Sequence, residues 1–217
     1  MSDNGTAPRY LVLRALAEAS PRQVRFLVPG LIPLRTLTLV AGVGGLGKST
    51  WLAGIAARVS RGDLGEPGNV IIVSYEDTTE EMLRPRVEAA GGDLGCVFDI
   101  VVPEHQGPVV LPSDLRELRE CVRAVQARLL IVDPIVAAID ISFDAHKDQH
   151  VRAVLAELAS LAEQEELAVA MVGHLNKAPS RDAYIRVANS VAFWNASRSV
   201  VLVTEDPEEP DDVRLVA

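Results

Sequence analysis

Cysteine is scarce in this 217-residue sequence, and a long apolar run is missing altogether. Only Cys96 and Cys121 are present, and no paired Cys or His motif accompanies them, which argues against a zinc site and against a fold held by disulfides. No apolar stretch reaches the roughly 18 residues that a membrane-spanning helix needs. The N-terminus also lacks the basic-then-apolar order of a signal peptide. These absences predict a cytoplasmic protein with reduced thiols and no membrane partner.

A broadly basic surface is also missing, because the formal net charge is -9. This balance argues against a protein that coats nucleic acid through a broadly basic surface, so any nucleic-acid site would have to be local. The length suits one large α/β domain, which can bury roughly 70% of the surface of its unfolded chain.

The most informative stretch is Gly42-Val43-Gly44-Gly45-Leu46-Gly47-Lys48-Ser49-Thr50, which fits a phosphate-binding loop. An apolar strand pattern precedes it, and a helical pattern follows from Thr50 to Ala57. Glycines let backbone N–H groups converge on phosphate oxygens at the positive end of a helix. The alternative is a glycine-rich strand-to-helix turn with an accidental Lys-Ser. The residues predicted to bind the nucleotide, expected to be ATP, are Gly42, Gly44, Gly45, Leu46, Gly47, Lys48, Ser49 and Thr50.

Apolar runs alternate with helical patterns along the rest of the chain. The predicted strands lie at about 37–40, 69–75, 97–102, 129–132, 168–173 and 199–203, with the start of another at 213–217, and the main predicted helices at 50–57, 80–90, 114–126 and 148–165. Strands that are apolar throughout are typical of a parallel sheet covered on both faces. The sequence therefore predicts an α/β fold with a mostly parallel central sheet and helices on both faces.

Two segments precede the phosphate loop. Residues 10–19 have a mostly helical spacing of apolar side chains, which predicts a short leading helix that Ser20-Pro21 ends. Residues 26–33 are apolar but contain two prolines and a glycine. They are a candidate wall for a nucleotide base, or else a packed loop at the edge of the sheet.

Polar side chains end three of the predicted strands: Glu76, Asp133 and His174. In parallel sheets ligands bind beyond the carboxyl ends of the strands, so these side chains should gather around the phosphate loop. Asp133 is predicted to hold Mg²⁺ together with Ser49. Glu76 is the candidate base for the attacking water, with Asp77 as its rival. His174 is a candidate for sensing the γ-phosphate, or else a structural histidine.

Several motifs together resemble the RecA-like ATPases of the hexameric RepA helicase type, and the likeness runs from about Phe26 to the C-terminus. They are the phosphate loop, Ser74-Tyr75-Glu76-Asp77, Leu83 to Gly91, Ile131-Val132-Asp133-Pro134, Gly173-His174-Leu175-Asn176-Lys177 and Arg186 through Arg198. The resemblance implies a RecA-like P-loop NTPase core. It also implies that Glu76 is the catalytic carboxylate, Asp133 the Mg²⁺ acid and His174 the phosphate sensor. Arg198 resembles the arginine that reaches a neighbouring subunit's nucleotide, and Arg186 is a competitor for that role. Lys48, which acts with them in catalysis, is expected from the phosphate-loop pattern itself to meet the β- and γ-phosphates.

The resemblance further implies a domain organisation and partners. Residues 1–25 are expected to form an N-terminal helical arm, and residues 26–217 a RecA-like ATPase domain truncated at its C-terminus. A homo-oligomer, a hexameric ring if complete, is expected to act on single-stranded DNA through Lys177, Arg181 and Arg186, with Tyr184 available for base stacking. Alternatively, that loop is a solvated mobile loop that does not bind DNA. Ala188-Asn189-Ser190 departs from the Ser-Gly-Ser that relatives usually have.

Three functional hypotheses follow. The first is an ATP-hydrolysing motor or helicase on single-stranded DNA in replication, with Mg²⁺ as cofactor. The second is a nucleotide-dependent switch or recombination accessory without unwinding activity. The third is a small-molecule P-loop kinase, which Glu76 and the His-Leu-Asn-Lys element fit less well.

Overall fold

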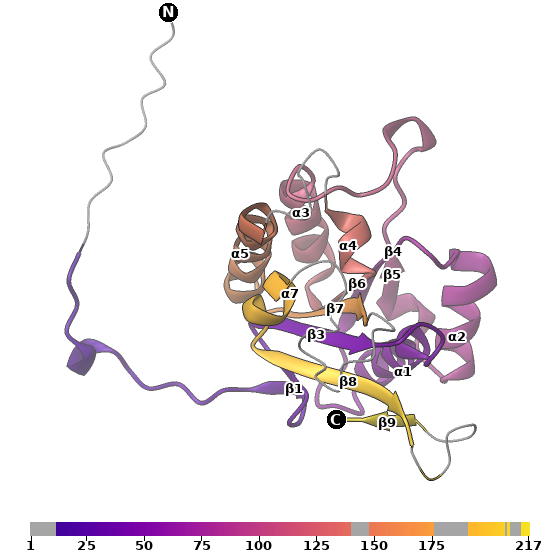
Figure 1. Ribbon diagram of the computed structural model, residues 1–217, viewed down its shortest axis with the longest axis horizontal. Coiled ribbons are helices and arrows are strands. Elements are labelled where there is room, and N and C mark those ends of the chain that lie inside the picture. Colours follow the sequence, from indigo (N-terminus) through magenta and orange to yellow (C-terminus); the bar gives the residue numbers. More distant parts are fainter. Residues whose placement is uncertain (1–11, 140–147, 176–190, 207, 209–213) are drawn as a thin grey trace, which may run out of the picture.

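The central sheet is mostly parallel, as the sequence predicts. The computed structural model describes residues 12–139, 148–175, 191–206, 208 and 214–217. Within these residues seven strands form one sheet in the order β5-β4-β6-β7-β3-β8-β9 (Figure 1). Neighbouring strands are parallel, except that β9 runs antiparallel to β8. In sheet order the bounds are Val97–Asp99, Asn69–Ser74, Ala127–Asp133, Ala168–His174, Thr36–Gly42, Ser199–Glu205 and Arg214–Val216.

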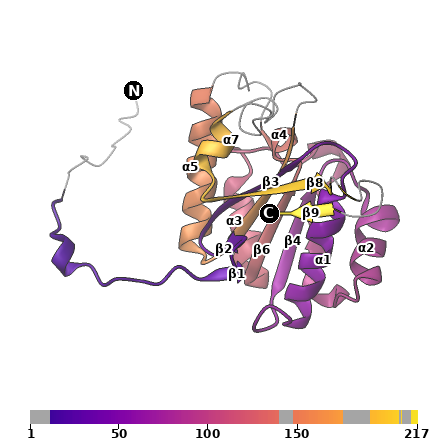
Figure 2. The same cartoon turned by 60° about the horizontal axis from the view of Figure 1, so that its bottom comes forward.

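Helices cover both faces of the sheet (Figures 1 and 2). Leu130 and Ile131, neighbours in β6, belong to opposite core clusters because side chains alternate along a strand. Ile131 shares its cluster with Leu52 of α1, whereas Leu130 shares its cluster with Leu118 of α3 and Leu155 of α5. The helices are α1 (Lys48–Arg61) and α2 (Arg84–Ala89) on one side, and α3 (Leu115–Val125), α4 (Ile135–Ala138), α5 (Asp148–Gln164) and α7 (Val191–Ala196) on the other.

The strand register aligns the carboxyl ends of the four central strands. Gly42 at the end of β3 pairs with His174 at the end of β7. Ser74 at the end of β4 pairs with Asp133 at the end of β6. Since β6 and β7 are neighbours, the ends of all four strands meet at one edge of the sheet.

Some elements differ from their predicted bounds. The helix predicted for residues 80–90 starts as a π-helical turn, Thr79–Leu83, and continues as α2. The strand predicted for residues 97–102 ends at Asp99, because β5 is an edge strand that pairs with β4 over three residues. Short 3-10 helices lie at Leu94–Cys96 and Glu104–Gln106. No helix among the described residues combines the length and apolarity needed to cross a membrane.

The leading helix predicted for residues 10–19 is wrong within the described part of that segment, residues 12–19. There the chain forms only a 3-10 turn at Leu16–Glu18, and none of its residues is buried. Figure 1 shows this segment extending away from the sheet. A helix of about ten residues, as predicted, depends on packing for its stability. Leu13 and Leu16 are fully or almost fully exposed, so they pack against nothing among the described residues.

Residues 26–33 lie at the wrong end of the sheet to form the wall for a nucleotide base. They contain β1 (Phe26–Val28) and β2 (Ile32–Pro33), which pair as a hairpin. The Ser199 hydroxyl at the start of β8 donates to the Leu31 carbonyl. The start of β8 is an amino end, whereas the phosphate loop follows the carboxyl end of β3. The segment is therefore a packed hairpin at the amino end of the sheet, which agrees with the packed alternative in its position but not in its lack of regular structure.

Candidate nucleotide-binding site

The phosphate loop folds through two glycines with left-handed backbone conformations. Gly45 has φ 84°, and Gly47, which immediately precedes α1, has φ 80°. Residues with a Cβ atom rarely adopt these angles, so glycine is required for this path. The loop brings the amino end of α1, with its unpaired N–H groups and partial positive charge, to the carboxyl edge of the sheet.

Lys48, the charged residue of the phosphate loop, is buried, with 4% of the residue exposed. Its Nζ donates to the carbonyls of Gly42, at 3.1 Å, and Val43, at 3.0 Å. Burial lowers the pKa of Lys48, and the nearby carboxylates of Asp133 and Glu76 oppose this shift. A buried ammonium with so few acceptors is poised to interact with an anion such as a phosphate.

Ser49 and Asp133 meet as the metal-site prediction requires. The Ser49 hydroxyl donates to Asp133 Oδ2 at 2.5 Å, and Asp133 is 6% exposed. Burial raises the pKa of Asp133, the hydrogen bond from Ser49 lowers it, and the charges of Glu76 and Asp77 raise it further. A hydroxyl beside a buried carboxylate is a donor set that fits Mg²⁺.

A nucleotide would have to complete the metal's coordination. Among the described residues, no three His, Cys, Asp or Glu side chains are grouped to hold a metal ion. In proteins Mg²⁺ commonly takes one or two protein ligands and fills its remaining positions with phosphate oxygens and water.

Glu76 and His174 lie beside Lys48 at the mouth of the site. His174 Nε2 is 3.6 Å from Glu76 Oε1, and His174 Nδ1 is 3.5 Å from Lys48 Nζ. Glu76 is 57% exposed, so water can reach its carboxylate. Glu76 lies two residues beyond the end of β4, and His174 is the last residue of β7, so both belong to the carboxyl edge of the sheet.

Lys48, Glu76 and His174 line a cavity of about 270 Å³. Thr50 belongs to its lining, whereas Leu46 is partly buried against the core and Gly44 lies exposed in the loop. Sequence reasoning missed one member, Arg86, which lines the cavity and forms an ion pair with Asp77. Spacing could not reveal this pair, because Asp77 lies in a loop and Arg86 in the following helix. The lining residues are Gly45, Gly47, Lys48, Ser49, Thr50, Glu76, Asp77, Arg86 and His174.

The remaining predicted residues lie away from this cavity or cannot be placed. The Arg198 backbone N–H donates to the Leu37 carbonyl near the amino end of β3, so Arg198 does not belong to the site of its own chain. Its predicted role in a neighbouring subunit's site stays a prediction. Lys177, Arg181 and Arg186 fall outside the described residues, as does Tyr184.

Comparisons with known proteins agree with this geometry. The AAA domain family matches residues 6–180. The DNA repair protein RadA of Streptococcus pneumoniae (strain ATCC BAA-255 / R6) is 30% identical over 155 residues, covering 70% of this chain and 33% of that protein. RadA of Mycobacterium tuberculosis (strain ATCC 25618 / H37Rv) is 29% identical, covering 70% of this chain and 29% of that protein.

The chain thus spans about a third of the length of the RadA proteins it matches. The matched region includes the phosphate loop, the strand that ends at Asp133 and the strand that ends at His174. Family, fold and the constellation at the carboxyl edge agree, and the chain belongs to the AAA domain family as an ATPase of the RecA-like P-loop kind.

Proposed function

We propose that this chain binds ATP with Mg²⁺ and hydrolyses the bond between the β- and γ-phosphates. One observation carries the proposal: the hydrogen bond from Ser49 to the buried Asp133 lies beside the buried Lys48, at the end of a glycine loop that opens a helix. Hydroxyl, carboxylate and ammonium groups in this arrangement match the needs of a magnesium triphosphate.

The residues divide the chemistry as follows. Lys48 binds the β- and γ-phosphates, and the Glu76 carboxylate accepts the proton of a water whose oxygen attacks the γ-phosphorus. The bond from the γ-phosphorus to the bridging oxygen breaks, and ADP leaves. His174, which lies between Lys48 and Glu76, senses the γ-phosphate by hydrogen bonding. Ser49 and Asp133 would hold Mg²⁺, which would neutralise part of the phosphate charge.

We further propose that hydrolysis drives a homo-oligomeric motor of the RepA helicase type on single-stranded DNA. The motifs named for that resemblance support this proposal. Arg198 lies at the amino end of β8, outside its own site, and a position outside the chain's own site is what an arginine acting on a neighbouring subunit's nucleotide needs. The division into an arm at residues 1–25 and an ATPase domain at residues 26–217 stays a prediction.

The comparisons favour a second candidate for the work that hydrolysis drives. The matching relatives are called DNA repair proteins, which supports the alternative of a recombination or repair accessory in which hydrolysis resets a partner interaction. This candidate shares the ATP site and differs in needing no strand separation.

Turnover of ATP by the purified chain tests the shared part of the proposal. We expect Mg²⁺-dependent release of phosphate that falls by about 100-fold or more in Lys48→Ala, the size of loss seen when one group that stabilises transition-state charge is removed. Wild-type protein that neither binds nor hydrolyses ATP would refute the proposal. Phosphate transferred to a metabolite instead of water would favour the kinase.

The two candidates separate when single-stranded DNA is added. A motor should show faster turnover with DNA, a mass in solution that increases with Mg²⁺ and ATP, and unwinding of a forked duplex. A switch should show slow turnover that DNA does not change, and no unwinding.

A further inference from the structure

Arg86 gives the phosphate cavity a second cation from the same chain. The guanidinium lines the cavity together with Lys48 and Ser49, and its side chain is 23% exposed. Its ion-pair partner, Asp77, is 15% exposed. Among the described residues, Lys48 and Arg86 are the two Lys or Arg side chains that line this cavity.

The position of Arg86 is fixed from two sides. From one side, the Asp77 backbone N–H donates to Ser74 Oγ at 3.1 Å, which ties the Asp77 turn to the end of β4. From the other side, α2 packs against α1, and Val87, next to Arg86, is 2% exposed. Since α1 starts with the phosphate loop, Arg86 is held relative to both the loop and the turn that carries Glu76.

Charge and donor count favour a phosphate as the ligand of this guanidinium. Arginine has five N–H donors in a planar fork. The ion pair with the Asp77 carboxylate is made through Nη1, so Nη2 and Nε can still donate to a phosphate. Arginine pairs strongly with phosphate oxygens, often through two donors. Glu76 and Asp77 make the lining acidic on this side, so a polyanion needs a local cation there besides Lys48.

We propose that Arg86 is a ligand of the terminal phosphates of the nucleotide, supplied in cis, and that Asp77 is the positioning residue that holds it in place. This inference rests on the proposed function, because it assigns a role within the same ATP site. It replaces the reading of Asp77 as a rival base. Arg86 would contact the end of the triphosphate that Glu76 faces, since both side chains line the same cavity.

The test compares nucleotide affinities of the full chain and its Arg86→Ala and Arg86→Lys variants, measured by calorimetry with ATP, ADP and AMP in Mg²⁺. The matched control is Arg84→Ala: Arg84 lies two residues earlier in the same helix and lines a separate apolar cavity beside β5. We expect Arg86→Ala to weaken ATP binding by about tenfold or more, as loss of a charge-assisted hydrogen bond does, to weaken ADP binding less, and to leave AMP binding unchanged. Arg86→Lys should recover part of the loss, and Arg84→Ala should bind like wild type.

A double mutant tests the role of Asp77. If Asp77 acts through Arg86, Asp77→Asn weakens ATP binding in the wild-type background but has no further effect in Arg86→Ala. Wild-type ATP binding with equal affinities in Arg86→Ala and Arg84→Ala would overturn the inference and leave the proposed function intact. Equal weakening of ATP, ADP and AMP together with a lower melting temperature would also overturn it, because that pattern belongs to a structural clamp. Failure of the wild type to bind ATP would instead refute the proposed function.

Discussion

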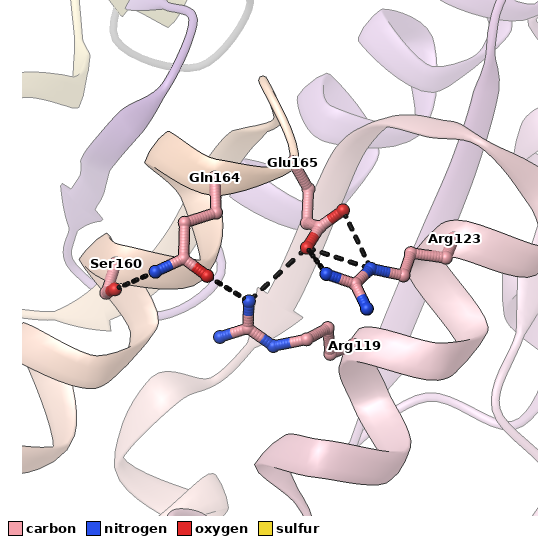
Figure 3. A network of polar contacts seen from close by, with 5 residues as sticks. All are labelled: Arg119, Arg123, Ser160, Gln164 and Glu165. Atoms are coloured by element: carbon pink, nitrogen blue, oxygen red, sulfur yellow. Dashed lines mark hydrogen bonds and ion pairs between the residues drawn. The ribbon is translucent and has the colours of Figure 1, made fainter.

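The two ends of the sheet carry charged clusters of opposite character. At the amino end, Arg119 and Arg123 of α3 converge on Glu165, which directly follows α5 (Figure 3). Arg123 Nη2 is 2.7 Å and Arg119 Nη1 is 3.3 Å from Glu165 Oε1. Arg119 also donates to Gln164, whose Nε2 donates to Ser160 Oγ at 2.9 Å. Hydrogen bonding from Arg123, with the charges of both arginines, lowers the pKa of Glu165.

At the carboxyl end the shifts have the opposite sign. Burial raises the pKa of Asp133 and lowers the pKa of Lys48, so each group is held where its charged form is disfavoured. The network around Glu165 favours its charged form, so we expect it to stabilise the fold. The difference indicates that burying the charges of Lys48 and Asp133 is unfavourable when no ligand is bound. A bound nucleotide and its cation would offset this unfavourable free energy.

Of the variants that compare the two clusters, Asp133→Asn should have the largest effect. The variant keeps the shape of the side chain and removes a buried charge, so we expect the free energy of unfolding to stay the same or rise while ATP turnover falls by about 100-fold. Steady-state phosphate release and urea denaturation measure the two quantities. A variant that loses stability yet keeps its turnover would reverse the comparison.

Glu165→Gln should show the converse behaviour. It removes the carboxylate that Arg119 and Arg123 share, and we expect a loss of about 1 kcal/mol in the free energy of unfolding, a modest value because Arg123 is exposed to solvent. ATP turnover should not change, since Glu165 precedes β7 at the end away from the phosphate loop. Urea denaturation at neutral pH gives the first number. Unchanged stability would mean that the network adds nothing to the fold.

The pH dependence of stability sharpens the same contrast. Because the pKa of Glu165 is lowered in the folded protein, its contribution is fully present above the ordinary carboxyl pKa and is lost as the pH falls through the folded value. The stability difference between wild type and Glu165→Gln should therefore be largest near neutral pH and shrink under acidic conditions. Urea midpoints of both proteins across this range measure it. A difference that grows on acidification would contradict the assignment.

The smallest effect is expected for Glu117→Gln. Glu117 pairs with Arg116 at 2.6 Å, but both side chains are more than half exposed. Solvent screens such pairs, so we expect no measurable change in stability or turnover. This variant is the matched control for Glu165→Gln, since both replace a carboxylate that binds arginine at α3. A loss as large as that of Glu165→Gln would show that burial is not what distinguishes the two pairs.

The sequence predicts the fold and the outline of the site for physical reasons. Continuous apolar strands identify a parallel sheet, and parallel strands bring their polar final residues, Asp133 and His174, to one edge. Gly45 and Gly47 mark the loop because their backbone angles exclude other residues. These signals are local in the chain.

What the sequence could not predict depends on contacts between distant segments. The pairing of Asp77 with Arg86 requires the angle at which α2 meets the strand edge, which no spacing encodes. Apolar spacing at residues 10–19 predicts a helix, but whether it forms depends on a packing partner. Residues 12–19 contact no such partner in the part of the chain that the structure describes. Residues 26–33 contact the start of β8, which lies parallel to β3, and so they belong to the amino end of the sheet. Their apolar composition does not reveal which end of the sheet they cover.

The central claim is that the phosphate loop and Asp133 together hold a magnesium nucleotide. The most direct measurement is the calorimetric affinity for ATP with Mg²⁺ and with EDTA, in wild type and in Asp133→Asn. We expect Mg²⁺ to strengthen ATP binding by about tenfold or more in wild type. This gain should vanish in Asp133→Asn, because the variant lacks the carboxylate that holds the cation beside the phosphates. An equal gain from Mg²⁺ in both proteins, or no ATP binding by the wild type, would contradict the claim.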